Sequence, residues 1–281
     1  MAMAKNRLLV FGLGYTARAL VKRLGPDWAV IGTTHDGRDG TLRFHRNHKL
    51  PDEVFEGITH ALVSIPPDKT GDPALDLHGS DIAALPGLSW VGYLSTTGVY
   101  GTRDGGWVDE TSELRPSGER GRMRVKAEAA WNQPRREAGL PVHIFRLAGI
   151  YGPGRSAFDP LRAGTAKRID AGAQKFSRIH VDDITNVLLA SIAKPRSGAI
   201  YNVCDDEPAA QADVIAYAAM LLGIEPPPLL PLAEADLSPM ARSFYADNKR
   251  VSNALIKREL GVTLRYPNYR AGLNAILAAS G

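Results

Sequence analysis

Short apolar runs alternate with longer amphipathic segments through the first two-thirds of the chain. The runs have the length of buried strands, and the segments between them repeat their apolar residues at helical spacing. Predicted strands are Arg7–Gly12, Trp28–Thr34, Thr41–Phe44, His60–Ser64, Ser89–Ser95 and Val142–Leu147. Predicted helices are Tyr15–Leu24, Pro51–Glu56, Pro73–Leu85 and Arg120–Ala138. This order predicts an α/β fold in which helices cover both faces of a parallel sheet.

Beyond Gly149 the alternation becomes less regular. Glycine, proline and basic residues dominate Tyr151–Arg178, and the proline-rich segment Glu225–Ala241 is expected at the surface. An alanine-rich helix is predicted at Tyr269–Ala279. Because no repeat or low-complexity linker divides the sequence, residues 1–281 are predicted to form one unit. Its core is expected at about 1–150, and about 151–281 is expected to be mostly a small C-terminal lobe with some returning core elements.

The composition is that of a globular protein with a substantial core. Hydrophobic residues make up 44% and charged residues 23% of the chain, which excludes extensive disorder. The formal net charge is +4, but lysine and arginine are spread along the sequence. Nucleic-acid binding is therefore not indicated, whereas a small anionic ligand fits the balance. Cys204 is the only cysteine, which excludes an internal disulfide and a cysteine-rich metal site, and no metal is expected.

The hydropathy pattern indicates no membrane segment. Met1 to Arg7 lacks the apolar run of a signal peptide, and no stretch reaches the roughly 20 apolar residues that span a bilayer. A cytoplasmic protein without a membrane partner is the expectation.

A glycine pair lies between the first predicted strand and the first predicted helix. Residues 12–17 have the Gly-x-Gly-x-x-Ala spacing of dinucleotide-binding turns. Gly12 permits the tight turn, Gly14 lets backbone approach a pyrophosphate, and Ala17 allows close packing of helix on sheet. The start of the helix, Tyr15–Thr16, offers N–H groups to the phosphates. The pattern predicts dinucleotide binding on a Rossmann-type sheet.

The choice between NAD and NADP is expected to be made at the end of the second strand, about 20 residues later. No carboxylate stands directly at that strand end. Thr34, His35 and Arg38 are placed to hydrogen-bond or neutralise a 2′-phosphate, although Asp36 is close enough to oppose it. We expect NADP in preference to NAD; the alternative is an ordinary exposed loop.

Four further segments resemble the extended short-chain dehydrogenases/reductases, the epimerase/dehydratase group. Residues 95–101, Ser-Thr-Thr-Gly-Val-Tyr-Gly, resemble a strand end of that family. Residues 146–154, Arg-Leu-Ala-Gly-Ile-Tyr-Gly-Pro-Gly, resemble its Tyr-Gly-Pro-Gly loop. His180–Asp183 matches the His-Val-Asp-Asp that opens a late helix, and Tyr201–Val203 matches the strand after it. The resemblance implies a Rossmann-type doubly wound parallel sheet with a small C-terminal substrate-binding lobe.

Two more features resemble an atypical branch of the same family. They are Pro66–Pro67, after the strand His60–Ser64, and the closing segments Asn248–Val251 and Tyr266–Pro267. Members of this branch are described as nucleoside-diphosphate-sugar epimerases or NAD(P)-binding proteins. The resemblance implies further cofactor contacts at the strand ends, from Ser64, Pro66 and Ser95.

The resemblance also implies a catalytic helix with a Tyr-x-x-x-Lys pair and a serine or threonine nearby. In this family the tyrosine passes a proton as hydride moves, and the lysine lowers its pKa and holds the nicotinamide ribose. Thr96 matches the serine or threonine. Gly121 and Glu128 set the register of the helix, which puts Arg120 at the tyrosine and Arg124 at the lysine.

Neither that register nor a shift by two residues, to Arg122 and Lys126, supplies a tyrosine. Arginine stays protonated at working pH and cannot exchange protons as the tyrosine does. Arg124 is still able to hold a ribose hydroxyl or a phosphate; the alternative is that these arginines form a solvated helix face. Tyr100 and Tyr151 are the nearest candidates for a replacement acid, and each also fits a structural role.

The resemblance implies an enzyme, an NAD(P)-dependent oxidoreductase or epimerase acting on a nucleotide sugar or a similar anionic metabolite. Basic residues that would attract such a substrate, or that merely face solvent, are Arg155, Arg162, Lys167, Arg168 and Arg178. The missing tyrosine favours an alternative from another class, a non-catalytic module that senses the NADP(H) pool. Family members often form homodimers through the catalytic helix, so a homodimer is the expected assembly.

Overall fold

The structure, a computed structural model, describes residues 6–238, 242 and 244–280. Its elements divide between two compact units: unit 1 contains residues 1–96, 122–146 and 185–201, and unit 2 contains residues 97–121, 147–184 and 202–281. A segment of the first half of the chain thus belongs to unit 2, and a segment of the second half returns to unit 1. Met1–Lys5 and Pro239–Ala241, to which some of the predictions extend, lie outside the described residues.

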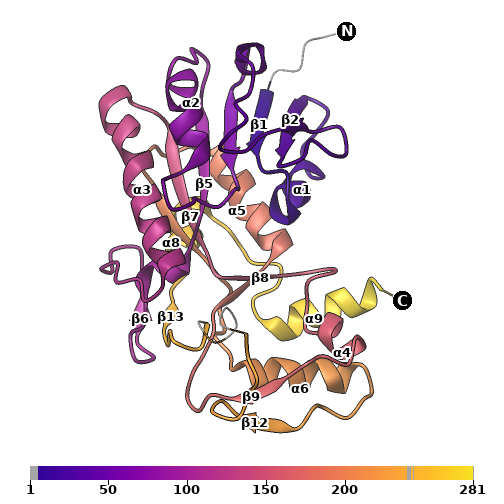
Figure 1. Cartoon of the computed structure of the whole chain (residues 1–281). Helices are drawn as coiled ribbons and strands as arrows, with labels where there is room; N and C mark the ends of the chain where they lie inside the picture. Colours follow the sequence, from indigo (N-terminus) through magenta and orange to yellow (C-terminus); the bar gives the residue numbers. More distant parts are fainter. Residues whose placement is uncertain (1–5, 239–241, 243, 281) are drawn as a thin grey trace. The chain divides into compact units, whose positions relative to one another are not determined.

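A seven-stranded sheet, most of which belongs to unit 1, has the order β11-β7-β5-β4-β1-β2-β3 (Figure 1). The strands are β1 (Asn6–Phe11), β2 (Trp28–Thr34), β3 (Leu42–Arg43), β4 (His60–Val63), β5 (Trp90–Thr96), β7 (Val142–Leu147) and β11 (Ile200–Val203). β1 pairs in parallel with β2 and β4, and β4 pairs in parallel with β5. The chain runs outward from β1 to β3 and then crosses back to extend the sheet on the other side of β1. The predicted doubly wound parallel sheet is confirmed.

Helices cover both faces of this sheet. The helical elements are α1 (Tyr15–Val21), η1 (Asp52–Phe55), α2 (Pro73–Ala83), α3 (Glu119–Ala138) and α5 (Val181–Ala193). The Trp90 indole of β5 donates to the Ser191 hydroxyl of α5 at 3.0 Å. The Tyr93 ring, also on β5, lies 6.1 Å from the Trp131 ring of α3. Because Trp90 and Tyr93 are an odd number of positions apart on one strand, their side chains point to opposite faces.

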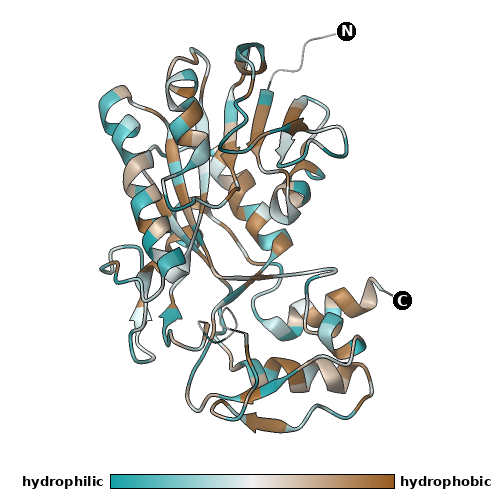
Figure 2. Ribbon diagram, viewed as in Figure 1, coloured by the Kyte–Doolittle hydropathy of each residue, from teal (hydrophilic) through white to brown (hydrophobic). Residues whose placement is uncertain are grey.

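The strands form because their side chains are apolar on both faces. Leu8, Leu9, Val10 and Phe11 of β1 are completely buried, and the central strands are brown in the hydropathy colouring of Figure 2. Full burial of each such side chain stabilises the fold by about 1.5–3 kcal/mol. The predicted strands and helices of the first 150 residues all appear, with ends shifted by a few residues; α1, for example, ends at Val21 rather than Leu24.

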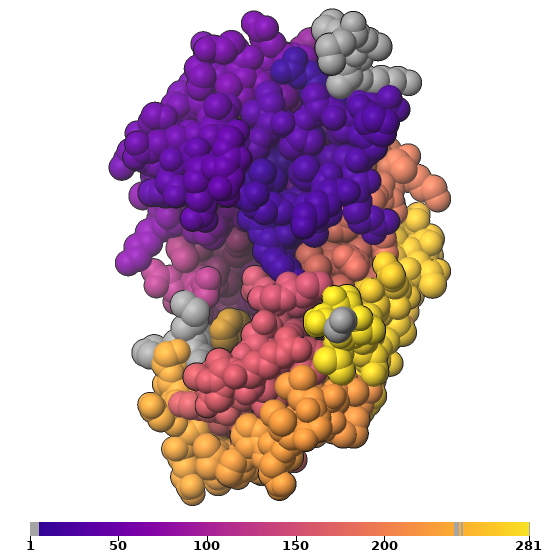
Figure 3. Space-filling model, turned by 90° about the vertical axis from the view of Figure 1, so that its right-hand side faces the viewer, coloured from indigo at the N-terminus to yellow at the C-terminus, as the bar shows by residue number. Residues whose placement is uncertain are grey.

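Unit 2 contains short helices and short parallel strand pairs. The pairs are β6 (Trp107–Val108) with β13 (Arg250–Val251), β8 (Gly149–Tyr151) with β10 (Arg178–His180), and β9 (Arg168–Asp170) with β12 (Leu229–Pro231). The helical elements are η2 (Thr97–Tyr100), α4 (Phe158–Arg162), α6 (Gln211–Leu221), α8 (Ala254–Leu260) and α9 (Tyr269–Ala278). Helices α4, α6 and α9 share one apolar cluster, and their surfaces lie side by side in Figure 3 (pink, orange and yellow).

Several predictions for the second half of the chain are confirmed. The late helix, α5, begins at Val181, and the strand after it, β11, contains Tyr201–Val203. Within the proline-rich segment, Leu229 and Leu230 are exposed as expected, whereas Ala235 is buried. None of the helices in the described ranges is both long and apolar enough to cross a membrane.

Candidate functional site

The turn between β1 and α1 is a tight glycine turn fixed to the end of β2. Gly12 has φ +90°, in the left-handed region, and its N–H donates to Thr33 Oγ1 at 3.0 Å. A Cβ on Gly12 would lie 2.6 Å from Ile65 Cγ2, so any larger residue is both strained and in collision. The Leu13 N–H donates to the Thr33 carbonyl at 2.7 Å. The turn therefore requires glycine at position 12.

Helix α1 begins beside open space. Gly14 is its N-cap with extended backbone, no side chain caps it, and its first turn carries no acidic residue. A Cβ built on Gly14 meets no heavy atom of the described residues within 4 Å. Thr16 and Ala17 pack inward at 6% and 0% exposure, so the helix lies close on the sheet. An uncapped helix start next to free space offers N–H groups and the positive end of the helix dipole to a phosphate, which fits a dinucleotide.

Thr34, His35 and Arg38 lie at the end of β2 as predicted. The Thr34 hydroxyl donates to the Asp36 carboxylate at 3.1 Å, and Arg38 Nε lies 3.8 Å from the same carboxylate. The Arg38 side chain is exposed. The His35 ring stacks on that of His45 with centroids 4.7 Å apart. The charge of Asp36 is thus partly offset by that of Arg38, which weakens its ability to repel a phosphate.

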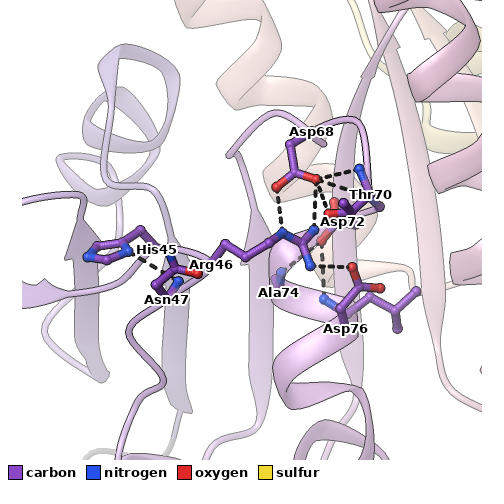
Figure 4. Close-up of polar contacts among 10 residues, drawn as sticks. His45, Arg46, Asn47, Asp68, Thr70, Asp72, Ala74 and Asp76 are labelled. Carbon is purple, nitrogen blue, oxygen red and sulfur yellow. Dashed lines mark hydrogen bonds and ion pairs between the residues drawn. The ribbon is translucent and has the colours of Figure 1, made fainter.

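Arg46 connects the segment after β3 to the loop after β4 (Figure 4). Its Nε and Nη2 donate to the two Asp68 carboxylate oxygens at 2.5 and 3.0 Å, and its Nη1 donates to Asp76 of α2 at 2.7 Å. Burial raises the pKa of Asp68, but hydrogen bonds from Arg46 and Thr70 outweigh it and hold the pKa well below its usual range. This bidentate pair fixes the loop as one charged cluster.

Ser64 and Pro66, predicted to contact the cofactor, lie in the loop that Arg46 holds. The Ser64 N–H donates to the Phe11 carbonyl at 2.9 Å, so the chain is still paired with β1 there. Pro66 is exposed. Both residues therefore follow the end of β4, next in the sheet to the β1 strand that leads into the glycine turn.

Ser95, also predicted to contact the cofactor, is instead engaged inside the protein. Its hydroxyl donates to Glu128 Oε1 of α3 at 2.5 Å. The same carboxylate receives Arg146 Nη2 at 2.7 Å, and Ser95, Glu128 and Arg146 are all at most 5% exposed. These contacts favour a structural role for Ser95. Thr96, the next residue, ends β5 and is half-buried.

The start of α3 carries arginines where the resemblance implies tyrosine and lysine. Arg120 is exposed. Arg124 is half-buried, and its Nη1 donates to the Tyr93 hydroxyl at 2.9 Å and to the Leu94 carbonyl at 2.6 Å. Burial raises the pKa of the nearby Asp72 to about 6, against hydrogen bonds from α2 and the charge of Arg124. The Arg124 guanidinium is therefore partly committed to β5.

Comparisons with known proteins agree with this architecture. The NAD dependent epimerase/dehydratase family model matches residues 82–204. The predicted resemblance to the epimerase/dehydratase group is confirmed over this segment. Protein YeeZ of Escherichia coli (strain K12) is 28% identical over 287 residues, which cover 94% of this chain and 97% of YeeZ.

Solved structures of this architecture cover nearly the whole chain. A functionally unknown conserved protein from Silicibacter pomeroyi DSS is 52% identical with a TM-score of 0.91, over 98% of this chain and 99% of the other. UDP-glucuronic acid 4-epimerase from Bacillus cereus, solved in complex with NAD, has a TM-score of 0.75 at 17% identity, over 96% of each chain. The second likeness shows the fold alone.

Two tyrosines, Tyr100 and Tyr151, were candidates for a replacement acid. Tyr100 is completely buried, and its hydroxyl donates to Asn202 Oδ1 at 2.7 Å. Burial raises the pKa of Tyr151, and the charges of Asp205 and Asp183 raise it further. The Tyr151 ring packs edge-on against His180, with centroids 5.2 Å apart. Burial favours a structural role for both tyrosines, and the raised pKa of Tyr151 also makes it a reluctant proton donor.

The basic residues of unit 2 divide between two cavities. Arg168, with Lys175, lines a cavity of about 200 Å³. Arg155 and Arg178 line another of about 310 Å³. The two remaining predicted cations, Arg162 and Lys167, are exposed and line neither of these cavities.

Three residues that shape the site were not predicted from the sequence. Thr33 receives the N–H of Gly12, Arg46 fixes the loop after β4, and Asp72 caps α2 beside Arg124. For Thr33 a signal existed, since a hydroxyl one residue before the strand end is able to bind a neighbouring turn. For Asp72 the signal was an aspartate directly before Pro73 at a helix start. Nothing near Arg46 in the sequence indicates its partners.

Proposed function

We propose that this chain is an NAD(P)-dependent oxidoreductase or epimerase that acts on a nucleotide sugar or a similar anionic metabolite. The geometry of the glycine turn is the observation that supports the cofactor assignment. Position 12 tolerates only glycine, position 14 faces open space, and α1 starts there without a cap or an acidic residue. A bound nicotinamide dinucleotide would supply hydride transfer. The backbone N–H groups at the start of α1, residues 15–17, would hold its pyrophosphate.

NADP is the preferred cofactor in this proposal. Arg38 supplies positive charge and His35 supplies a donor at the end of β2, and the charge of Arg38 partly offsets that of the nearby Asp36. Arg38→Glu is expected to weaken NADPH binding about tenfold more than NADH binding, because only NADPH carries the 2′-phosphate. Lys22→Glu, an equal charge change at an exposed position, is the matched control. Equal losses of both cofactors in Arg38→Glu would exclude the 2′-phosphate contact.

The substrate class is supported by the cavity of about 200 Å³ in unit 2. The rings of Phe176 and Tyr245 meet edge-to-face at 5.4 Å in its wall and offer apolar surface to a base or sugar. Arg168 lines the same cavity, and its Nε has no hydrogen-bond partner among the described residues. Lys175 is 3.8 Å from Asp213, so its charge is partly matched. A planar apolar group with a phosphate fits this combination.

Titration calorimetry with NADPH on a matched pair of glycine variants tests the cofactor site. Gly14 and Gly25 both have room for a side chain at ordinary φ. Gly14→Asp is expected to lower the affinity more than about tenfold, because its carboxylate would oppose the pyrophosphate, whereas Gly25→Asp leaves the affinity unchanged. Thermal unfolding checks that both variants fold. Unchanged affinity in Gly14→Asp would exclude the glycine turn as the cofactor site.

A non-catalytic NADP(H) sensor is the second candidate, because Arg124 is engaged with Tyr93 and Leu94 and Arg120 is exposed. The enzyme proposal predicts NADPH oxidation or sugar epimerisation with an anionic carbonyl or nucleotide-sugar substrate. The sensor predicts NADPH binding without turnover. Arg120→Tyr with Arg124→Lys restores the family pair, and general acid–base help of about 10²–10⁴-fold makes a rescued activity measurable. Binding without turnover in both the native chain and the double variant supports the sensor.

A further inference from the structure

The cavity of about 310 Å³ in unit 2 has apolar walls. Val214 and Ile215 of α6 and Leu273 of α9 supply aliphatic surface, and Tyr151 and Tyr269 supply aromatic surface; all five are less than one-tenth exposed. Its volume lies at the lower end of the roughly 300–1,000 Å³ of small-molecule sites. The cavity shares only Gln211 with the lining of the cavity at Arg168, and none of its lining residues belongs to the glycine turn.

One buried cation, Arg178, lines this cavity. Its Nη1 donates to the Phe176 and Ala209 carbonyls at 2.8 and 2.9 Å, and its Nη2 donates to Gln211 Oε1 at 2.9 Å. All three acceptors are neutral, and no carboxylate of the described residues lies within 4.0 Å of the guanidinium. A guanidinium has five N–H groups, so Nε–H and one Nη2–H stay outside these bonds.

The acid whose charge acts most on Arg178 is Asp205, which forms no ion pair with the guanidinium. Asp205 is 1% exposed, and its Oδ2 has no hydrogen-bond partner among the described residues. Burial raises the pKa of Asp205 to about 8, although the charge of Arg178 lowers it. The positive charge of Arg178 is therefore only weakly matched inside the protein. A buried and weakly matched charge is costly, and an anionic ligand relieves that cost.

We propose that this cavity binds a small monocarboxylic acid with an apolar body, and that Arg178 receives its carboxylate. A single negative charge matches the single buried cation, and the two oxygens of a planar carboxylate suit the two N–H groups that remain. The aliphatic and aromatic walls receive the rest of the molecule. Arg155, exposed on the same cavity lining, adds positive charge that favours the entry of an anion.

Calorimetric titration with 4-phenylbutyrate and with 4-phenylbutanol, its uncharged analogue, tests the site at pH 7. The acid is expected to bind at least about tenfold more tightly than the alcohol, because only the acid forms charge-assisted hydrogen bonds with Arg178. Arg178→Met is expected to remove this difference. Equal binding of acid and alcohol to the native chain, or no binding of the acid at millimolar concentration, would overturn the proposal.

A second pair of variants places the binding in the cavity without touching Arg178. Ala157, the N-cap of α4, lines the cavity, whereas Ala163, the C-cap of the same helix, is exposed and does not. Ala157→Trp fills the cavity and is expected to weaken acid binding at least about tenfold, whereas Ala163→Trp leaves it unchanged. Undiminished binding in Ala157→Trp would overturn the assignment to this cavity, even if Arg178→Met fails to fold.

Discussion

Two buried arginines, one in each unit, have opposite kinds of partners. Arg146 in unit 1 is 3% exposed, and its Nε and Nη2 donate to both carboxylate oxygens of Glu128 at 2.7–3.2 Å. Arg178 in unit 2 is 8% exposed, and the partners of its guanidinium are two carbonyls and an amide oxygen. The first guanidinium has an ion-pair partner within the fold, whereas the second has none within 4.0 Å among the described residues.

This difference separates a structural charge from one that is available to a ligand. Glu128 and Arg146 both lie in segments that resemble the family, and Ser95, in a third such segment, donates to the same carboxylate. Their pairing joins α3 to β5 and β7, so these residues hold the sheet together. Burial alone does not distinguish the two arginines; the chemistry of their partners does.

The largest expected effect comes from removing the carboxylate partner of Arg146. Glu128→Ala leaves a buried guanidinium and the Ser95 hydroxyl without their acceptor, and is expected to lower the free energy of unfolding by about 3–5 kcal/mol. Urea unfolding followed by circular dichroism measures this loss. Glu137→Ala, on the exposed end of the same helix, is the control and should change stability by less than about 0.5 kcal/mol. A similar small loss for Glu128→Ala would show that the pair does not stabilise the sheet.

The raised pKa of Asp205 predicts a pH dependence. Its pKa of about 8 in the folded chain lies above the roughly 3.9 of an unfolded aspartate, so the folded chain keeps a proton that the unfolded chain releases between those pH values. Stability therefore falls as pH rises from about 4 to 8, by at most about 1.4 kcal/mol per pH unit. Asp205→Asn should remove this slope.

Two buried histidines give stability a pH dependence of the opposite sign. Their contribution is the same in the wild type and in Asp205→Asn, so it cancels when the two proteins are compared. Burial lowers the pKa of His60 and of His143 to about 4, so both favour the folded state above pH 6.5 and lose that stabilisation in acid. Urea unfolding at pH 5, 6 and 7 measures the difference. Parallel pH profiles for the two proteins would mean that Asp205 is ionised and that the charge of Arg178 is matched after all.

Removing the cation of unit 2 is expected to have a smaller effect on stability. Arg178→Met loses three hydrogen bonds but also removes a weakly matched buried charge, so the expected loss is about 1–2 kcal/mol. Urea unfolding of Arg178→Met and of Glu128→Ala under the same conditions compares the two losses of stability directly. A loss as large as that of Glu128→Ala would make Arg178 a structural residue like Arg146 and would end the distinction between them.

The sequence predicted the features that depend on backbone and periodicity. The fully apolar run of β1, the glycine spacing at Gly12 and Gly14, and the alternation of strands with helices each have a local signal, and the structure has the corresponding elements. The sequence predicted the position of Ser95 at a strand end but not its role. Its hydroxyl donates to Glu128, which is 33 positions away and leaves no local signal.

Side-chain pairs between distant segments had no such signal. Glu128 and Arg146 are 18 positions apart, and Arg46 and Asp68 are 22 positions apart, on different elements in both cases. Which side chains meet across a sheet depends on the strand order and on where each loop returns, and neither is encoded in a short pattern. The same reason explains why the sequence grouped Arg168 and Arg178 together, although they line different cavities.

Arg124 is an intermediate case between the two buried arginines, and it gives the smallest and most discriminating effect. It donates to neutral oxygens, those of Tyr93 and Leu94, as Arg178 does, but it is only half-buried, and its charge acts on the carboxyl of Asp72. Arg124→Lys keeps the charge and one donor, so we expect a loss below about 1 kcal/mol by urea unfolding. If the guanidinium serves mainly to join α3 to β5, NADPH affinity measured by calorimetry should change less than about threefold. A change of tenfold or more in NADPH affinity at unchanged stability would instead assign Arg124 to the cofactor, as its position in the family helix implies. Replacing a residue that contacts the ribose alters NADPH binding directly, whereas replacing a residue that only joins α3 to β5 does not.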